Sequence, residues 1–284
     1  MITLSHIPEV QSRLRSARSE KKTIGLVPTM GYLHEGHLSL IRKAKQEHDI
    51  VVVSIFVNPT QFAPTEDLDK YPRDIVRDTE LAQQAGCDII FTPSAEEMYP
   101  QGFSSFVTVE GLSSVLEGKF RPTHFKGVTT VVLKLFNIIQ PETAYFGQKD
   151  AQQSIVIQKM VKELNVPIRI EIVPTKREQD GLAMSSRNVY LNPAQRANAV
   201  VLSQSLQLAT SLIANGERDP FRIIREMDQL ISATQPTQID YIEIVDAATL
   251  ERKQELRNGE KILIPLAVRF GSTRLIDNAI LTVQ

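Results

Sequence analysis

The sequence has little cysteine, almost no net charge and no long hydrophobic run. Cys87 is the only cysteine among 284 residues, which excludes an internal disulfide framework and fits a reducing compartment. A formal net charge of -1 argues against a nucleic-acid-binding surface. No apolar run approaches the roughly 20 residues that a membrane span needs, and residues 1–18 show no signal peptide. We therefore expect a cytoplasmic protein that binds neither nucleic acid nor a membrane.

Two common nucleotide-binding signatures are also missing. The chain contains no GxxxxGK[ST] pattern, which argues against γ-phosphoryl transfer by a P-loop route. No GxGxxG follows the first predicted strand of the sheet, so dinucleotide redox chemistry is disfavoured as well. If the protein binds a nucleotide, it must do so through other loops.

Strands and helices alternate over residues 1–175. The predicted strands are 23–27, 49–57, 88–91, 143–146 and 168–173, and the predicted helices are 37–48, 127–139, 150–164 and one that follows Pro72 and ends at Gly86. This alternation predicts an α/β fold with a doubly wound, Rossmann-like parallel sheet. Right-handed crossovers then place the carboxyl ends of all strands along one edge.

Three further assignments concern local structure in this domain. Ser5 is expected to cap a first helix with a buried stripe of Ile7, Val10 and Leu14. The helix after Pro72 is expected to bury Ile75, Val76, Leu81 and Ala82. Residues 106–109 are expected to form a short strand.

The pattern changes near Pro174 and predicts a smaller α+β domain over residues 176–284. Asn192 and Pro193 have the order expected of an N-cap and a first helical residue. Helices are expected at about 193–214 and 220–233, and strands at about 239–245, 261–269 and 274–277. The length of the chain agrees with about two domains.

Residues 27–37 (VPTMGYLHEGH) connect a predicted strand to a predicted helix. Pro28 is expected to end the strand, and Gly31 to let the backbone approach a ligand closely. A helix N-terminus offers N–H groups and a partial positive charge to phosphate. His34 and His37 can donate further hydrogen bonds to phosphate oxygens as negative charge develops there. The stretch therefore indicates a nucleotide site.

Two other interpretations of this histidine pair are open. His34 and His37 could be ordinary surface or capping residues, or two ligands of a zinc ion. Zinc is disfavoured because Cys87 lies in an apolar segment and no third ligand is near in sequence. The position of the pair at a strand-to-helix turn favours nucleotide over both alternatives.

Three more polar stretches fall at the predicted ligand edge. In residues 58–62, Gln61 could hold a hydroxyl or a carboxylate, although a solvated loop is the alternative. In residues 147–153, Lys149 could bind a phosphate, and Gln153 lies one turn further on a similar side; the alternative is an exposed lysine beside an N-capping Asp150. In residues 180–187, the small hydroxyl residues before Arg187 suit a loop that wraps phosphate oxygens, although a turn with an exposed arginine fits too.

These groups converge on a polyanion, and the missing motifs leave attack at the α-phosphate of a nucleotide, with pyrophosphate leaving. Such a reaction depends on positioning and on cationic or hydrogen-bonding groups around the phosphoryl group. Mg²⁺ on the β- and γ-phosphates would supply part of the charge, so no metal site made of protein ligands is expected. Cys87 is expected to be a core residue, and His6 and His48 to lie on helical surfaces. His124, near Arg121 and Lys126, could help to steer an anionic substrate.

Six motifs occur in one order: PTMGYLHEGH, VNPTQF, YPRD, FGQKDAQQ, DGLAMSSRN and TRLIDN. With them the chain closely resembles the pantothenate synthetase (pantoate–β-alanine ligase) family over essentially its whole length. Residues 34–37 are similar to the HIGH motif of the wider nucleotidyltransferase superfamily, and residues 184–187 to its second phosphate-binding motif.

The resemblance implies an ATP-dependent ligase that works in two steps. Pantoate would attack the α-phosphate of ATP to give pantoyl adenylate and pyrophosphate, and β-alanine would then displace AMP. Catalysis is assigned to His37, His34 and Lys149. Gln61 would contact pantoate and β-alanine, and Gln153 would contact pantoate. The implied ATP site comprises Met30, Gly31, Tyr32, Leu33, His34, Glu35, Gly36, His37, Gly147, Gln148, Lys149, Asp150, Lys176, Met184, Ser185, Ser186 and Arg187.

The resemblance also implies Mg²⁺ and a homodimer formed through the N-terminal domains. The smaller domain is expected to close over ATP through Ser185, Ser186 and Arg187. Three rivals share some of these motifs: a nucleotidyltransferase that adenylates a phosphate ester, an aminoacyl-tRNA synthetase, and a nucleotide-binding regulator without enzymatic activity. The small and nearly neutral chain disfavours the tRNA-binding alternative.

Overall fold

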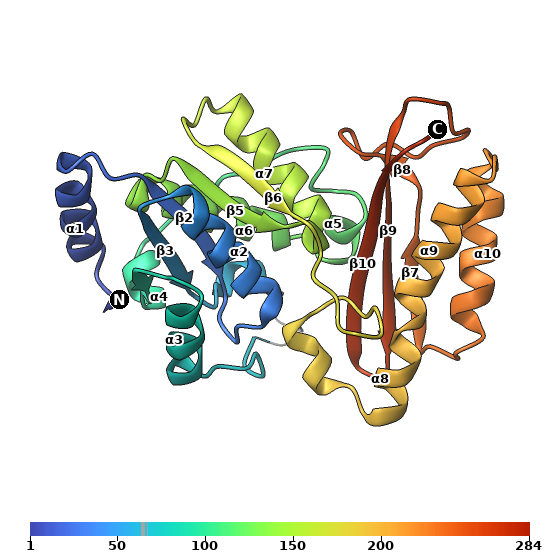
Figure 1. Ribbon diagram of the computed structural model, residues 1–284, viewed down its shortest axis with the longest axis horizontal. Helices are drawn as coiled ribbons and strands as arrows, with labels where there is room; N and C mark the ends of the chain where they lie inside the picture. Colours follow the sequence, from blue (N-terminus) through green and yellow to red (C-terminus); the bar gives the residue numbers. More distant parts are fainter. Residues whose placement is uncertain (64–65, 67) are drawn as a thin grey trace. The chain divides into compact units, whose positions relative to one another are not determined.

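The protein is described by a computed structural model that covers residues 1–63, 66 and 68–284. The chain divides into two compact units (Figure 1). The N-terminal unit comprises Met1–Gln148 and Gln152–Pro174, and the C-terminal unit comprises Lys149–Ala151 and Thr175–Gln284. The short segment around Lys149 thus belongs with the C-terminal unit, although the chain on both sides of it belongs to the N-terminal one.

The N-terminal unit contains a six-stranded parallel sheet with the order β1-β4-β3-β2-β5-β6. Its strands are β1 (Ile2–Leu4), β2 (Ile24–Thr29), β3 (Ile50–Ile55), β4 (Ile89–Phe91), β5 (Thr143–Gly147) and β6 (Arg169–Val173). The predicted doubly wound sheet is confirmed. The chain proceeds from β2 to β3 on one side and returns to β5 on the other, so the strand order reverses at β2, which is where such sheets bind their ligands.

Helices pack on both faces of this sheet (Figure 1). They are α1 (Ile7–Ser19), α2 (Glu35–Glu47), α3 (Ile75–Gln84), α4 (Ala95–Met98), α5 (Glu117–Phe120), α6 (His124–Ile139) and α7 (Ala151–Glu163), with the 3-10 turns η1 (Pro59–Gln61) and η2 (Gln148–Asp150). Apolar residues of α2 such as Leu38 and Ile41 pack with Val51 and Val53 of β3 in one buried cluster. This packing fixes the N-terminal end of α2 beside the carboxyl end of β2.

Two expectations at strand and helix ends are wrong. The N-cap of α1 is His6 rather than Ser5, and the N–H of Ile7 donates to the carboxylate of Glu97 at 2.7 Å, so a residue distant in sequence satisfies this helix end. Pro28 lies within β2 instead of ending it. The strand tolerates the proline because β5 pairs with β2 only at Gly25 and Leu26, before the proline is reached.

Two further expectations, a strand at residues 106–109 and the buried face of α3, fail because contacts with other parts of the chain override the local sequence pattern. Residues 106–109 form no strand; Val107 instead bonds through its N–H and C=O to the hydroxyls of Thr130 and Thr129 on α6. In α3, Ile75 and Val76 are 46% and 69% exposed. The buried face of α3 carries Asp78 and Ala82, so an acidic side chain lies where the sequence pattern predicts apolar ones.

The C-terminal unit combines helices with a four-stranded antiparallel sheet. This agrees with the predicted small α+β domain, for which three strands were expected. Its elements are the 3-10 turn η3 (Ser186–Tyr190), α8 (Pro193–Ala199), α9 (Val201–Ala214), α10 (Pro220–Ser232), β7 (Gln238–Ile242), β8 (Val245–Asp246), β9 (Lys261–Phe270) and β10 (Thr273–Thr282). The order is β10-β9-β7, and β8 also pairs with β9. Asn192 forms the expected N-cap, in a reciprocal capping box with Gln195.

Residues 193–214 are long and apolar enough to meet the length and composition criteria of a membrane span, which the sequence analysis did not expect. Core helices of globular proteins meet the same criteria. Leu202, Leu206 and Ile213 of this stretch are buried in the hydrophobic core of the C-terminal unit, together with residues of α10 and β9. Packing inside the unit therefore accounts for the apolar character of these helices.

Candidate active site

Both histidines of the predicted nucleotide turn belong to the N-terminal end of α2. His34 is the N-cap, and its Nδ1 accepts a hydrogen bond from the Gly36 N–H at 3.1 Å. The Nδ1 of His37 accepts from the His34 N–H at 3.3 Å, which completes a reciprocal capping box. The ring centroids are 4.1 Å apart with an angle of 33° between the planes. The capping interpretation is thus correct for the Nδ1 atoms, and it fixes both rings side by side.

The capping bonds determine which ring nitrogen carries the proton. A backbone N–H donates to Nδ1 in each ring, so the neutral forms of His34 and His37 carry hydrogen on Nε2. Two neighbouring Nε2–H groups can donate to oxygens of a phosphate without any positive charge on the rings. The backbone of this turn offers fewer N–H donors to a phosphate than the sequence suggested, because the N–H groups of His34 and Gly36 already donate inside the turn.

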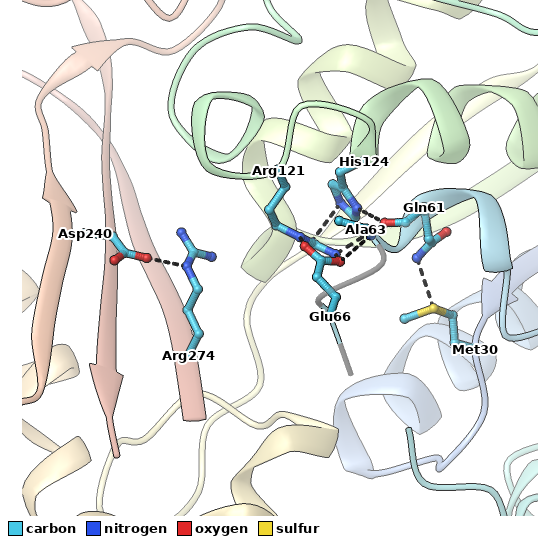
Figure 2. A network of polar contacts seen from close by, with 8 residues as sticks. All are labelled: Met30, Gln61, Ala63, Glu66, Arg121, His124, Asp240 and Arg274. Carbon is cyan, nitrogen blue, oxygen red and sulfur yellow. Dashed lines mark hydrogen bonds and ion pairs between the residues drawn. The ribbon is translucent and has the colours of Figure 1, made fainter. Parts of the chain in front are cut away.

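Gln61 is connected to this turn by a direct contact. Its Nε2 donates to Sδ of Met30 at 3.0 Å (Figure 2), and Met30 immediately follows β2. The Oε1 of Gln61 accepts from Asn58 Nδ2 at 3.1 Å. Gln61 is only 7% exposed and Asn58 only 1%, so residues 58–61 are not the solvated loop that was the alternative. The turn predicted to bind ATP and the glutamine predicted to bind pantoate therefore lie together.

Buried polar contacts hold the segment of Gln61 in place. Oδ1 of Asn58 accepts from the hydroxyl of Tyr99 at 2.8 Å and from that of Thr60 at 3.0 Å, and Nδ2 of Asn58 donates to the carbonyl of Gly127 at 3.1 Å. A Cβ at Gly127 would lie 2.4 Å from the carbonyl oxygen of Thr60. The absence of a side chain at Gly127 thus lets α6 approach η1 closely enough for these bonds to form.

The basic cluster around His124 is largely neutralised inside the protein (Figure 2). Arg121 forms an ion pair with Glu66 at 2.6 Å, and although burial alone would raise the pKa of Glu66, the hydrogen bonds and charge of Arg121 lower it below its usual value. The Nδ1–H of His124 donates to the Gln61 carbonyl at 3.1 Å, and its Nε2 accepts from Arg121 at 3.3 Å. Burial, together with the charge of Arg121, lowers the pKa of His124 to about 4. The cluster supports the Gln61 backbone through contacts with its carbonyl.

Other predicted site residues of the N-terminal unit have separate positions. Glu35 forms a surface ion pair with Arg42 at 2.8 Å, so its carboxylate is directed along α2. Gly147 ends β5, Gln148 begins η2, and the partly buried Gln153 lies in the first turn of α7. These positions follow the carboxyl end of β5, the direct neighbour of β2 in the sheet.

In the C-terminal unit, Lys149 is held through its backbone. Its carbonyl accepts from Nδ2 of Asn278 at 2.9 Å, and its ammonium group lies 3.8 Å from a carboxylate oxygen of Asp150. Its side chain is only 20% exposed. The alternative, that Lys149 is an exposed surface lysine, therefore does not hold. Asn278 lies on β10 within the TRLIDN stretch, to which the sequence analysis assigned no role.

The predicted phosphate loop of the C-terminal unit is a folded-back segment. The Met184 N–H donates to the Lys176 carbonyl at 3.0 Å, which brings these two predicted ATP-site residues together. Ser185 caps η3 by accepting from the Arg187 N–H at 3.2 Å, and Ser186 is buried. This segment is anchored by the ion pair between Arg177 and Asp277, at 2.6 Å. In the same unit Asp240 binds Arg274 at 2.5 Å (Figure 2).

Sequence reasoning missed Asp78, which supports the turn before His34. Its two carboxylate oxygens accept from the N–H groups of Tyr32 and Leu33, each at 2.7 Å, and the side chain is almost fully buried. Burial raises the pKa of Asp78, although the two backbone bonds oppose this effect. A signal existed in the sequence, because an aspartate four residues before the buried Ala82 interrupts the apolar face of a helix.

The remaining reactive side chains play no part in this arrangement. Cys87 is buried, and burial raises the pKa of its thiol to about 12, so it is the core residue that was predicted. His48 is not on a plain helical surface as expected, because its ring packs edge-on against Tyr145 with centroids 5.9 Å apart. Among the residues that the structure describes, no group of three or more His, Cys, Asp or Glu side chains is arranged to hold a metal ion.

Comparison with known proteins identifies the family. The family model for pantoate-beta-alanine ligase matches residues 2–280, so the chain belongs to the pantoate-β-alanine ligases and is an enzyme of the ligase class. The pantothenate synthetase of Moorella thermoacetica is 55% identical over 284 residues, and that of Acetivibrio thermocellus is 54% identical over 283 residues. Both alignments cover 100% of this chain and of the relative.

Solved structures agree with this assignment. The pantothenate synthetase of Thermus thermophilus has a TM-score of 0.92 and 45% identity, and the match covers 98% of this chain and 99% of that one. The pantoate-β-alanine ligase of Francisella tularensis, complexed with beta-gamma ATP and β-alanine, has a TM-score of 0.82 and 37% identity over 99% and 97% of the two chains. The expected family and fold class are thereby confirmed.

Proposed function

We propose that this chain joins pantoate to β-alanine, with ATP converted to AMP and pyrophosphate, and that the residues predicted from the sequence carry out the reaction. In the first step an oxygen of the pantoate carboxylate bonds to the α-phosphorus, and the bond to the pyrophosphate oxygen breaks. In the second step the β-alanine amine attacks the acyl carbon, loses a proton, and displaces AMP. No covalent enzyme intermediate is needed, because neither step of this scheme requires a serine or cysteine to act as a nucleophile.

The observation that supports this proposal best is the contact between Met30 and Gln61, at 3.0 Å. It joins the turn proposed to bind ATP to the side chain proposed to bind pantoate, at the sheet position where the strand order reverses. A carboxylate held by Gln61 would therefore lie near a phosphate held by the imidazoles, and such pre-positioning lowers the barrier for attack.

We assign each group a role in the adenylation step. The Nε2–H groups of His34 and His37 donate to oxygens of the transferring phosphoryl group, and their bonds strengthen as charge develops there. Lys149 supplies a positive charge to the same phosphates. Gln61 and Gln153 orient pantoate, and Gln61 also contacts β-alanine. The remaining residues proposed to bind ATP are those of residues 30–37, 147–150 and 184–187, together with Lys176.

Mg²⁺ is proposed to arrive with ATP, bound mainly to its phosphate oxygens. There it neutralises charge on the pyrophosphate leaving group. We expect chelation of Mg²⁺ to abolish AMP release, and full activity without any divalent cation would contradict this role.

Product analysis with one substrate omitted at a time tests the proposed reaction. We expect pantothenate and repeated release of AMP only when ATP, pantoate and β-alanine are all present. ATP and pantoate without β-alanine should release only as much pyrophosphate as there is enzyme to hold the adenylate, and ATP alone should release no AMP. Formation of a dinucleotide-like product from a phosphate ester would instead support the nucleotidyltransferase alternative. ATP binding without any turnover would support a regulator.

Three broader properties complete the proposal. The family resemblance suggests a homodimer through the N-terminal units, which analytical ultracentrifugation tests directly; a monomer at assay concentrations would refute it. The C-terminal unit is proposed to close on ATP through Ser185, Ser186 and Arg187, and equal X-ray scattering profiles with and without MgATP would refute that. Fractionation of the source cells would test the proposed cytoplasmic location.

A further inference from the structure

The backbone before His34 has a conformation that it does not adopt by itself. Gly31 has a φ of 85° and Tyr32 a φ of 50°. Glycine adopts a positive φ at no steric cost, but a positive φ is unfavourable for Tyr32, which carries a side chain. Such a conformation persists only when surrounding contacts over-determine it. The structure must therefore contain groups that stabilise this turn from outside.

Asp78 of α3 supplies the main contacts. Its Oδ2 accepts from the Tyr32 N–H and its Oδ1 from the Leu33 N–H, both at 2.7 Å, and the residue is 1% exposed. Hydrogen bonds from N–H groups to a carboxylate are short and strong. We call this pair of bonds the backbone clamp. It uses both oxygens of one side chain on two consecutive amides, which fixes the orientation of their peptide planes.

The residue before Asp78 strengthens the same attachment. Arg77 donates from Nη1 to the Leu33 carbonyl at 3.0 Å, and its guanidinium lies 5.2 Å from the centroid of the Tyr32 ring. Neighbouring residues of α3 thus hold Leu33 through both its N–H and its C=O. The peptide that follows Leu33 carries the N–H of His34, and this N–H is the donor to Nδ1 of His37.

The clamp also decides which groups of the turn are directed at a ligand. The amides of Tyr32 and Leu33 point toward a buried carboxylate and are therefore committed inside the protein. Next along the chain come the two imidazoles, whose Nδ1 atoms accept backbone bonds. Any rotation of the Leu33 peptide would move the His34 N–H and release the ring of His37. The orientation of both rings thus depends on a residue more than forty positions away in the sequence.

From this geometry we infer that Asp78 is a positioning residue for adenylation: its carboxylate orients the turn so that His34 and His37 present their Nε2–H groups to the α-phosphate together. The inference rests on the proposed function for the identity of the reaction. Asp78 itself touches no substrate in this scheme, and acts only through the backbone of Tyr32 and Leu33.

Asp78→Asn is the main test, because it keeps the size of the side chain but leaves only one oxygen to accept two N–H groups. We expect the single-turnover rate of pantoyl-adenylate formation and kcat to fall on the order of 100-fold, as for other small misplacements of reacting groups. The KM for pantoate should stay within about 2-fold, because the clamp does not hold the proposed pantoate ligands. Wild-type kcat in a folded Asp78→Asn variant would overturn the inference, as would a loss that matches only a smaller folded fraction.

Asp74→Asn is the matched control. Asp74 is the exposed N-cap of the same helix and accepts from the Arg77 N–H at 3.1 Å. Asparagine caps helices about as well as aspartate, so this variant removes one negative charge from α3 without changing the clamp. We expect its kcat to remain within about 2-fold of wild type, as for exposed positions in general. A 100-fold loss of kcat in Asp74→Asn would show that catalysis depends on the negative charge of α3 and not on the clamp. That result would overturn the inference.

Gly31→Ala tests the clamp from its other side and decides the question if Asp78→Asn does not fold. A Cβ at Gly31 would lie 3.0 Å from Oδ2 of Asp78 and 3.0 Å from Cγ2 of Ile55, at a positive φ. We expect the same selective loss of kcat. An unchanged rate of adenylate formation would overturn the inference.

A readout that does not require activity separates this inference from the proposed function. Long-range ¹H–¹⁵N spectra report the tautomer of each of the five histidine rings. We expect His34 and His37 to be Nε2–H tautomers in the wild-type protein and to become mixtures in Asp78→Asn. If the wild type forms no pantothenate but the tautomers change as expected, the reaction is wrong and the clamp stands. Unchanged tautomers in the variant would overturn the clamp even in an active enzyme.

Discussion

The histidines of the N-terminal unit show how one residue type serves two purposes. In His34 and His37 a backbone N–H donates to Nδ1, so the neutral rings carry hydrogen on Nε2. In His124 the opposite holds: Nδ1–H donates to the Gln61 carbonyl, and Nε2 accepts from Arg121. The first two rings are proposed to donate to a ligand, and the third is a neutral internal support.

The neutral state of His124 leads to a prediction about pH and stability. Its pKa is about 4 in the folded protein, against about 6.5 in an unfolded chain. Between these two values the unfolded state binds more protons, so stability falls as the pH decreases from about 6.5 to about 4. The full contribution is roughly 3 kcal/mol. Arg121 opposes protonation of the ring, and Glu117 and Glu66 favour it, but burial is the largest influence.

Denaturant unfolding of the wild type and of His124→Asn across this pH range checks the prediction. The asparagine amide can still donate to the Gln61 carbonyl, but it does not titrate. We expect the stability difference between wild type and variant to change between pH 6.5 and 4 and to stay constant above pH 7. A difference that is independent of pH would contradict the neutral, buried state of His124.

The sequence alone suggests many of the proposed site residues, but it does not reveal the residues that support them. His34, Gln61 and Lys149 stand in short motifs at strand ends, where parallel topology makes ligand binding expected. Asp78 and Asn58 act through contacts with residues 45 and 69 positions away, respectively. A periodic pattern contains no information about such pairings. In α3 it correctly predicted Ala82 as buried, but it wrongly predicted Ile75 and Val76 as buried and missed Asp78.

At the level of elements, the close approach of α6 and η1 is the contact most open to test. Gly127→Ala would place a Cβ 2.4 Å from the Thr60 carbonyl oxygen and 2.5 Å from the Gln61 nitrogen. Alanine favours a helix over glycine by about 1 kcal/mol, but displacing backbone in a packed interior costs about 1–3 kcal/mol. We expect the steric effect to dominate, with lower stability and a raised KM for pantoate because Gln61 shifts.

Thermal unfolding and steady-state kinetics of Gly127→Ala provide the measurement. Asn137→Ala, at an exposed position of the same helix, is the control and should change stability by less than about 0.5 kcal/mol. A Gly127→Ala protein that is more stable than wild type and has an unchanged KM would mean that the α6–η1 contact does not position Gln61.

Elements with a strong local signal were predicted well, and those fixed by tertiary contacts were not. The buried strand β3 and the capped start of α8 follow from β-branched residues and from the Asn192–Pro193 pair. The N-terminal end of α1 is satisfied instead by Glu97, and residues 106–109 bond to threonine side chains of α6. In both cases the deciding partner comes from another part of the chain.

At the level of the whole molecule, the proposed ligands are distributed over two units. The imidazoles and Gln61 belong to the N-terminal unit, whereas Lys149 and Ser186 belong to the C-terminal one. The family model and the Thermus thermophilus structure match almost the whole chain, so the family assignment and the fold class cover both units.

In the proposed reaction, His37 and its neighbours promote transfer of the adenylyl group of ATP to pantoate before β-alanine takes part. Exchange of labelled pyrophosphate into ATP, measured with MgATP and pantoate but without β-alanine, tests this claim most directly. We expect exchange that requires pantoate and that falls at least about 100-fold in a folded His37→Ala variant. Exchange without pantoate, no exchange in the wild type, or an undiminished rate in His37→Ala would contradict the claim.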